Sequence, residues 1–538
     1  MKHLEVWGQK VDVDALKAAD DVTPDLDRIV REGFESITPS DYYRLKTMGV
    51  CSQNVVGAHM IRIRIPHGIA NRDQLHRVAE LAERYGDGTV HLTTRTNLEL
   101  HRVPTPKLLE VLEALHEVGL TTRASCGHTV RNVLGCQAAG ICAHEVFDTR
   151  PYVRAAHELV VAKAADHCVR LPRRLNVSFG GCGSCARHAQ VNDVGFVATR
   201  YPALGDGFAV WVAGSLGSQG RFSHPLCAFV RAEHALDVIE VVIDLYTEHG
   251  LRDQPAKARL KFLVEDWGIE RFRDAFRSAF EARTGTQPVL GEATLPEDTR
   301  AEPAGTGVLP QRQAGRFRVR VRVPLGDLSP DQLRRLADLA VDDADGLVRL
   351  TPEQNAELAW IREERIGRVL AELSSAGLGS FGTGDISDVR ACPGTQHCVL
   401  AVSDSPAAAA LISSSFSSDP IDEEIVRRMR VHISGCANSC AQHQASDIGF
   451  AGCKVKIDGV VGEGFQVFVG GRLGRRVRMA DRIGRVHIGA VDDTVRAIVD
   501  AFTTERTDDE ELADVVERLG SRAFAASVTE RLGSGVFV

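Results

Sequence analysis

Apolar and polar positions follow a strand period and then a helix period along this chain, and the same succession occurs twice. Each copy reads as a strand, an amphipathic helix, a second strand and a second helix that ends at a glycine. In the first copy these elements are Met60–Pro66, Gln74–Tyr85, Val90–Leu100 and a helix ending at Gly119, and in the second copy they are Phe317–Pro324, Gln332–Asp342, Val348–Trp360 and a helix ending at Gly377.

Residue identities repeat in register between the two copies. Arg64 and Arg322, and likewise Asn97 and Asn355, are 258 residues apart. A constant offset over this stretch indicates an internal duplication of a β-α-β-α unit. Duplication serves folding in many proteins, so the repeat alone predicts an α+β fold and no activity.

Composition narrows the class of protein. Hydrophobic residues make up 44% of the 538 residues, charged residues 25%, and the net charge is -8. An acidic chain of ordinary composition is not expected to bind nucleic acid. Residues 1–16 have no signal-peptide pattern, and we find no run of apolar residues long enough for a membrane span. We therefore expect a cytoplasmic protein, in which clustered cysteines indicate metal or catalysis rather than disulfides.

Eight of the 13 cysteines form two matched sets. The first quartet is Cys136, Cys142, Cys182 and Cys185, and the second quartet is Cys392, Cys398, Cys436 and Cys440. Two close pairs on separate loops suit a [4Fe-4S] cluster, which needs four converging thiolates. The alternatives are a structural zinc site and buried cysteines without a ligand. The five-residue gap within one pair disfavours zinc, whose close pairs are usually nearer in sequence.

The second quartet carries a family resemblance. Ala391–Cys398 followed by Ser434–His443 resembles the cluster motif of siroheme sulfite and nitrite reductases. The segments Met60–Pro66, Tyr85–Gly88, Leu92–Arg95, Val130–Val133, Leu171–Arg173, Ala258–Phe262 and Glu265–Gly268 also look like that family. The resemblance implies that the second quartet holds a [4Fe-4S] cluster and that Cys440 also bridges to the siroheme iron.

The resemblance also implies the fold and its division. We expect an α+β, internally duplicated nitrite/sulfite reductase-like fold, in which each pseudo-symmetric half has a ferredoxin-like half-domain and a siroheme/cluster-binding α/β domain. The expected parts are an N-terminal segment (1–54), the first ferredoxin-like half-domain (55–125), the first α/β domain (126–283), a linker (284–316), the second ferredoxin-like half-domain (317–384) and the second α/β domain (385–538).

A small oxyanion substrate calls for basic side chains beside the heme. By resemblance these catalytic groups are Arg95, Arg131, Arg174 and Asn176. At the repeat offset Arg95 corresponds to Glu353, and a carboxylate would repel an anion. The first copy should therefore supply the anion-binding face and the second copy the cluster, with the active site between the halves. Without the resemblance, each arginine would be read as a solvated surface residue.

Two features depart from the family. Sulfite reductases commonly show Lys-x-Lys where this chain has Arg174-Leu175-Asn176. The asparagine resembles the nitrite-reducing branch, and arginine binds an anion well but releases its proton reluctantly. The first quartet is the other departure. We expect it to bind a second metal centre, foremost another [4Fe-4S] cluster; zinc, a metal-free relic of duplication and a disulfide stay open.

The carboxylates of siroheme require further cations. Our candidates are Arg62, Arg64, Arg259 and Lys261. The alternative interpretation of Arg62 and Arg64 is a surface strand whose arginines form salt bridges with neighbouring side chains. No glycine-rich dinucleotide fingerprint occurs. Electrons should therefore arrive from an external donor, either ferredoxin or a flavoprotein, and we expect a monomer.

The sequence thus predicts an enzyme that reduces nitrite to ammonia or sulfite to sulfide. Competing readings are a precorrin-3B synthase-like enzyme of cobalamin biosynthesis, a family member acting on another nitrogen or sulfur oxo-compound, and a zinc-stapled binding protein without enzymatic activity.

Overall fold

Two five-stranded sheets carry the sequence repeat in this computed structural model, which describes residues 11–291, 293, 295–296, 307–380, 382–457 and 460–533. The first sheet has the order β1 (Val50–Ser52), β2 (Ala58–Ile63), β5 (Leu98–Pro104), β4 (Val90–Leu92) and β12 (Asp327–Leu328). The second has the order β10 (Val308–Pro310), β11 (Arg316–Val321), β14 (Ala356–Arg362), β13 (Leu347–Leu350) and β3 (Ile69–Asn71). Each sheet takes its last strand from the other half of the chain, so the two ferredoxin-like halves are interlocked.

The second strand predicted in each copy is a hairpin of two strands, which corrects the sequence interpretation. In the first copy β4 pairs antiparallel with β5, with Val90 opposite Leu100. The chain reverses at Thr93, whose N–H donates to the Asn97 carbonyl at 3.0 Å. Apolar residues flank this short turn on both sides, which hid it from the periodicity. The unit is therefore β-α-β-β-α, and the turn carries Arg95 away from the sheet.

Amphipathic helices cover one face of these sheets. They are α5 (Arg72–Tyr85) and α6 (Leu108–Glu117) in the first half, and α13 (Pro330–Asp343) and α14 (Ile366–Ser375) in the second. Capping boxes begin α5 at Asn71 and α13 at Ser329, because each side chain accepts from the third helical N–H. His76 and Asp338 join α5 to α13 at 2.9 Å. One apolar core runs through both halves.

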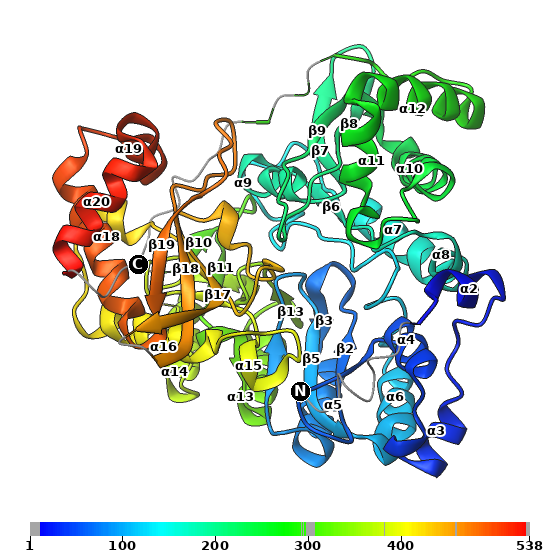
Figure 1. Cartoon of the computed structure of the whole chain (residues 1–538), viewed down its shortest axis with the longest axis horizontal. Helices are drawn as coiled ribbons and strands as arrows, with labels where there is room; N and C mark the ends of the chain where they lie inside the picture. The colour runs from blue at the N-terminus through cyan, green and yellow to red at the C-terminus, as the bar shows by residue number, and fades with distance from the viewer. Residues whose placement is uncertain are drawn as a thin grey trace.

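Two α/β domains complete the duplication and lie on opposite flanks of the molecule (Figure 1). The first has the sheet β6 (Val177–Gly180), β7 (Val194–Tyr201), β8 (Gly205–Val212) and β9 (His224–Arg231). Its helices are α7 (Arg150–Ala162), α8 (Ala164–Arg170), α9 (Gly183–Ala186), α10 (Ala235–His249), α11 (Leu260–Trp267) and α12 (Ile269–Thr284). A separate apolar core supports this domain.

The second α/β domain repeats this arrangement with one more strand. Its sheet is β15 (Arg390–Ala391), β16 (Val431–Ser434), β17 (Ile448–Ile457), β18 (Val460–Val469) and β19 (Asp481–His487). Its helices are α15 (Gly394–His397), α16 (Ser405–Ser418), α17 (Glu424–Arg427), α18 (Val491–Glu505), α19 (Leu512–Leu519) and α20 (Ser521–Leu532). In both domains a short turn that holds cysteines follows the first strand of a parallel pair, β6 with β7 or β16 with β17, and precedes the second.

The sheets extend beyond the segments expected for the half-domains. β1 lies in the predicted N-terminal segment, together with α2 (Val13–Ala18), α3 (Leu26–Glu32) and α4 (Pro39–Thr47). β10 lies in the predicted linker, of which residues 292, 294 and 297–306 fall outside the described residues. Both strands are edge strands joined by antiparallel pairing. Such short edges have little periodicity of their own, so the sequence did not reveal them. Among the described residues, no helix has the length and apolar character needed to cross a membrane.

Candidate active site

A cavity of about 380 Å³ lies between the two halves and collects side chains from both. Thr94, in the β4–β5 turn of the first half, donates its Oγ1 proton to the Cys440 carbonyl of the second at 3.0 Å. The His101 and His397 rings stack across the same junction with centroids 4.1 Å apart. The site therefore depends on both halves, in agreement with the location expected from the sequence.

The second quartet lines this cavity with all four of its cysteines. Cys392 follows β15, Cys398 ends α15, and Cys436 and Cys440 lie in the turn after β16. Cys440 is exposed to the cavity, whereas the other three are partly buried. The Gly435 N–H donates to Cys392 Sγ at 3.1 Å. A side chain at Gly435 would approach the Ser403 carbonyl to 2.8 Å, so glycine lets the two cysteine loops meet.

The four residues predicted to bind the anion line the same cavity as Cys440. Arg95 is held by the Asn192 amide oxygen, which accepts from its guanidinium at 2.7 Å. Arg131 donates to the carbonyls of Ser125 at 2.7 Å and Gly127 at 3.1 Å. Both guanidinium groups are thus fixed by the protein before any ligand binds, which lowers the entropy cost of binding one.

Arg174 and Asn176 differ from these two because their cavity-facing groups lack protein partners. Within the part of the chain that the structure describes, no hydrogen bond or ion pair holds the Arg174 guanidinium. Asn176 is buried, and its Oδ1 has no hydrogen-bond partner. Its backbone is anchored instead, since the Asn176 N–H donates to Asp193 Oδ2 at 2.8 Å. A buried polar atom without a partner calls for a ligand or an ordered water.

Positive charge is concentrated in this cavity. The charge of Arg259, together with burial, lowers the pKa of Arg174 to about 9. Burial lowers the pKa of Arg95 to about 9, against the attraction of Asp193. Burial also lowers the pKa of Arg131. Because desolvation and like charges disfavour these cations, an anion that enters the cavity is bound strongly.

Two of the four predicted cofactor cations line the cavity and two do not. Arg62 donates to Glu99 at 2.6 Å and to Cys126 Sγ at 2.9 Å, and Arg259 forms a bidentate contact with Asp193 at 2.7 and 2.9 Å. Burial opposes the charge on Arg62, but Cys126 and Glu99 outweigh it and raise its pKa well above the ordinary value.

Arg64 and Lys261 are placed differently from the expectation. β2 ends at Ile63, and Arg64 turns inward to donate to the carbonyls of Ala124 and Val130, both at 3.1 Å. Lys261 in α11 donates to the Ser215 carbonyl at 3.3 Å. Neither side chain lines the cavity, so the structure gives both a role in fixing loops. The two-residue period puts Arg64 on the side of Arg62, but it does not reveal where the strand ends.

Sequence reasoning missed several polar residues of the cavity wall. They are Tyr42, Lys46, Gln53, His91, His101 and His397. The Lys46 ammonium lies 4.1 Å from the centre of the Tyr42 ring. Cys51 and Cys126 also meet here, with sulfurs 3.2 Å apart. No spacing motif joins these residues, because they come from α4, β1, β4, β5, α15 and connecting loops that only the fold brings together.

The wall of this cavity fits siroheme beside a [4Fe-4S] cluster. Four thiols converge on one side, with Cys440 facing the open space. Arg62, Arg95, Arg131, Arg174 and Arg259 face the same space and match a polycarboxylate ligand. The unpartnered Oδ1 of Asn176 shows that the polar wall is incomplete without a ligand.

The first quartet lies at the equivalent place in the other half, where all four of its cysteines line a cavity of about 600 Å³. Arg430 and Asp447 there repeat the relation between Asn176 and Asp193, since the Arg430 N–H donates to Asp447 Oδ2 at 2.9 Å. Both halves therefore keep the same backbone contact to an aspartate, but the neutral Asn176 of the first half corresponds to the positively charged Arg430 of the second.

Sequence comparisons with known proteins point to the same two kinds of domain that the structure contains. The family described as "Nitrite and sulphite reductase 4Fe-4S domain" matches residues 126–283 and 382–535, and the "Nitrite/Sulfite reductase ferredoxin-like half domain" matches residues 53–118 and 309–376. The chain is similar to the ferredoxin–nitrite reductase of Synechococcus elongatus (35% identity over 84% of this chain and 87% of that protein). It is also similar to the assimilatory ferredoxin-dependent nitrite reductase of Haloferax mediterranei (32% identity over 94% and 91%).

A solved structure extends the likeness to the whole fold. The NirA protein of Mycobacterium tuberculosis superimposes with a TM-score of 0.84 at 26% identity, covering 96% of this chain and 98% of that one. The duplicated ferredoxin-like halves and the two cysteine-bearing α/β domains thus have the arrangement that the resemblance implied, with siroheme and a [4Fe-4S] cluster as cofactors. The chain belongs to the nitrite and sulfite reductase family.

Proposed function

We propose that this enzyme reduces nitrite to ammonia with electrons from ferredoxin, and that the cavity beside the second quartet is its active site. The observation that carries the proposal is the Arg174 guanidinium, which lines the cavity with Cys440 and has no hydrogen-bond or ion-pair partner among the described residues. A cation held by no carboxylate is available to an anion. The ferredoxin-dependent nitrite reductases among the relatives support both the substrate and the donor.

Siroheme and the cluster, when bound, would pass the six electrons of the reaction from ferredoxin to the anion. The protein's own residues bind and orient the substrate. Arg131 and Arg95 are held by backbone and amide oxygens, and Arg174 lines the same cavity without a hydrogen-bond or ion-pair partner among the described residues. This arrangement places nitrite by charge-assisted hydrogen bonds, with little reorganisation on binding.

The reaction consumes protons as well as electrons. At neutral pH these arginines stay charged even though burial and like charges lower their pKa values, so their main role is to bind the anion. Lys46 lines the same cavity with an ammonium group that carries three N–H donors. We assign proton supply to Lys46 and water, in place of the lysine pair that is typical of the sulfite reductases.

Steady-state turnover with reduced viologen as electron donor tests the substrate. We expect turnover of nitrite to exceed that of sulfite, because Asn176 supplies a neutral amide where a second cation would favour the more highly charged sulfite. Asn176→Lys should shift the preference toward sulfite. A wild-type enzyme that reduces sulfite much faster than nitrite would contradict our reading of this position.

Arg174→Ala is expected to lower kcat/KM for nitrite. The loss should correspond to an increase of about 1.5–3 kcal/mol in the activation free energy, the scale of a charge-assisted hydrogen bond. Arg95→Ala should have an effect in the same range but smaller, because Asn192 already takes part of the hydrogen-bonding capacity of Arg95. Arg173→Ala is the matched control, since Arg173 is exposed like its neighbour Arg174 but does not line the cavity. Equal kinetics for the Arg174 and Arg173 variants would assign Arg174 to the solvated surface.

A further inference from the structure

Three thiols of the first quartet lie closer together than any three thiols of the second. The Sγ atoms of Cys136, Cys182 and Cys185 all lie within 4.8 Å of one another, and no other group of three metal-ligating side chains in the described part of the chain is as compact. Cys182 Sγ and Cys185 Sγ are 3.5 Å apart. Cys142 is buried in the same cluster and lines the same cavity.

These separations distinguish a single metal ion from a cubane. In a tetrahedral site with metal–sulfur bonds of about 2.3 Å, neighbouring sulfurs are about 3.8 Å apart. Around a [4Fe-4S] cluster the irons themselves separate the thiolates, and the sulfurs lie about 6 Å apart. Three sulfurs of the first quartet, those of Cys136, Cys182 and Cys185, fit the tetrahedral spacing, whereas no three sulfurs of the second quartet, all within the described residues, approach one another as closely.

The turn that carries Cys182 and Cys185 has the local geometry of a metal-binding turn. The N–H groups of Gly181 and Cys182 both donate to Cys185 Sγ, at 3.0 and 3.2 Å. Two such donors stabilise a thiolate. A side chain at Gly180 would come within 2.5 Å of Ala186, so the tightness of this turn requires a glycine. Zinc uses pairs of cysteines separated by two intervening residues in tetrahedral sites.

The surroundings close the site on the remaining sides. All four cysteines are buried, with exposed fractions between 4% and 9%, and Ala359 of the second half packs against them. Arg318, itself buried, is attracted by Cys136 and Cys142 and also pairs with Glu357 at 2.8 Å. A cation here offsets the negative charge that four thiolates leave on a divalent ion.

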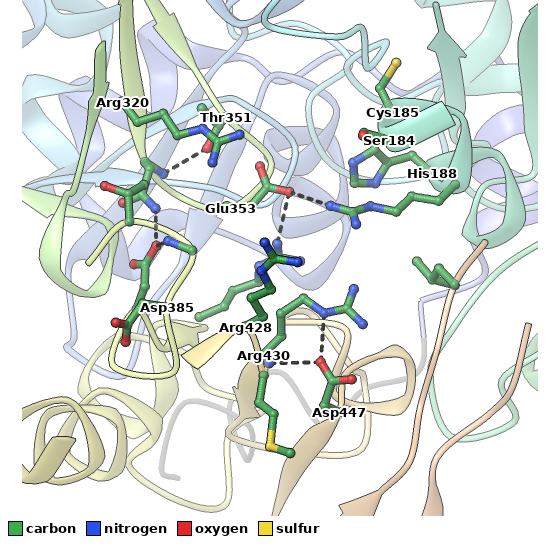
Figure 2. A pocket seen from close by; sticks show the side chains of 18 of the residues that line it. Ser184, Cys185, His188, Arg320, Thr351, Glu353, Asp385, Arg428, Arg430 and Asp447 are labelled. Atoms are coloured by element: carbon green, nitrogen blue, oxygen red, sulfur yellow. Dashed lines mark hydrogen bonds and ion pairs between the residues drawn. The ribbon is translucent and has the colours of Figure 1, made fainter. Parts of the chain in front are cut away.

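The adjoining cavity is unsuited to a second siroheme. Figure 2 shows the Glu353 carboxylate directed into this space, with Cys185 on one wall. Arg390 and Arg187 approach that carboxylate to 3.5 and 3.8 Å. Burial opposes ionisation, but these cations lower the pKa of Glu353 to about 2. Two of the cations that a polycarboxylate ligand would need are therefore engaged by a fixed negative charge.

We propose that Cys136, Cys142, Cys182 and Cys185 bind one Zn²⁺ ion in a closed, tetrahedral, structural site. The ion fixes the loop of Cys136 and Cys142 to the turn of Cys182 and Cys185. Its position is the pseudo-symmetric counterpart of the catalytic cluster. The duplication has thus produced one redox centre, in the second half, and one structural metal centre, in the first.

Metal analysis of the purified holoenzyme tests this proposal. Expressed in medium containing both iron and zinc, the wild-type chain should hold about five irons, four from the cluster and one from siroheme, and about one zinc. Cys182→Ser should lose the zinc and keep about five irons. Cys168→Ser, which changes a buried cysteine of α8 outside both quartets, should keep both metals.

X-ray absorption at the zinc edge of the wild-type protein keeps the test valid if Cys182→Ser fails to fold. We expect four sulfur ligands at about 2.3 Å. About nine irons per chain would overturn the proposal in favour of a second cluster. Five irons without zinc, a sixth iron in place of zinc, or zinc with nitrogen and oxygen ligands would each overturn it as well.

Discussion

Cys436→Ala is expected to lower the iron content from about five atoms per chain to at most about one, because a cubane held by three thiolates on two short loops is not retained. Nitrite turnover should fall below detection, since electrons reach the anion only through the cluster and siroheme. The structural basis is the convergence of four cysteines on one cavity wall, two of them in the turn after β16. Iron and sulfide analysis with an absorption spectrum measures the outcome.

Cys453→Ala is the matched control for this experiment. Cys453 is also partly buried and lies in β17, next to β16 in the same sheet, but it does not line the cavity. Its replacement should leave iron content and turnover unchanged. Retention of four or more irons in Cys436→Ala, with the control unchanged, would show that Cys436 is not a ligand.

The cysteine turns and the duplication were predictable because both depend on local spacing and on register. Asn97 and Asn355 occupy the same position of the hairpin turn in both halves, where the backbone carbonyl of each accepts from the N–H of Thr93 or Thr351. The exchange of β3 and β12 between the halves was not predictable. Strands of two or three residues have no periodicity, and their pairing partners lie more than 200 residues away.

The sequence predicted the cavity residues that belong to a recognisable motif. It was less accurate for residues that were chosen only because their charge suits the ligand. Arg62 and Arg64 are both basic and share one side of a strand, yet Arg62 faces the cavity and Arg64 is buried among backbone carbonyls. The difference arises where β2 ends, one residue before Arg64. Lys46 and the two stacked histidines were missed because their role depends on tertiary proximity alone.

The short distances between the sulfurs of Cys136, Cys182 and Cys185 could not be predicted from the sequence either. Its spacing left a cluster, zinc and a metal-free relic open, since the same four cysteines permit sulfur separations of 4 or 6 Å, depending on the turns between them. The structure discriminates because the Cys182–Cys185 turn is tightened by two N–H donors to one sulfur.

Asp193→Ala is expected to destabilise the protein by about 3–5 kcal/mol, because it leaves the buried Arg259 guanidinium without a counter-ion. Asp193 is fully buried, and besides the bidentate contact with Arg259 it accepts the Asn176 N–H. For a domain of this size, such a loss should lower the midpoint of thermal unfolding by at least about 6 °C. Asp338→Ala, which removes a more exposed carboxylate from Arg72 and His76, should cost at most about 1 kcal/mol.

The double variant Asp193→Ala/Arg259→Met separates the two roles of this pair. Removing both charges should recover much of the lost stability, since the penalty arises from one unpaired buried charge. Nitrite turnover should not recover, because Arg259 lines the cavity and its charge acts on Arg174. Thermal unfolding and steady-state kinetics on the same preparations measure both effects. If stability and turnover recover together in the double variant, then Arg259 serves Asp193 alone and contributes nothing to the bound anion or cofactor.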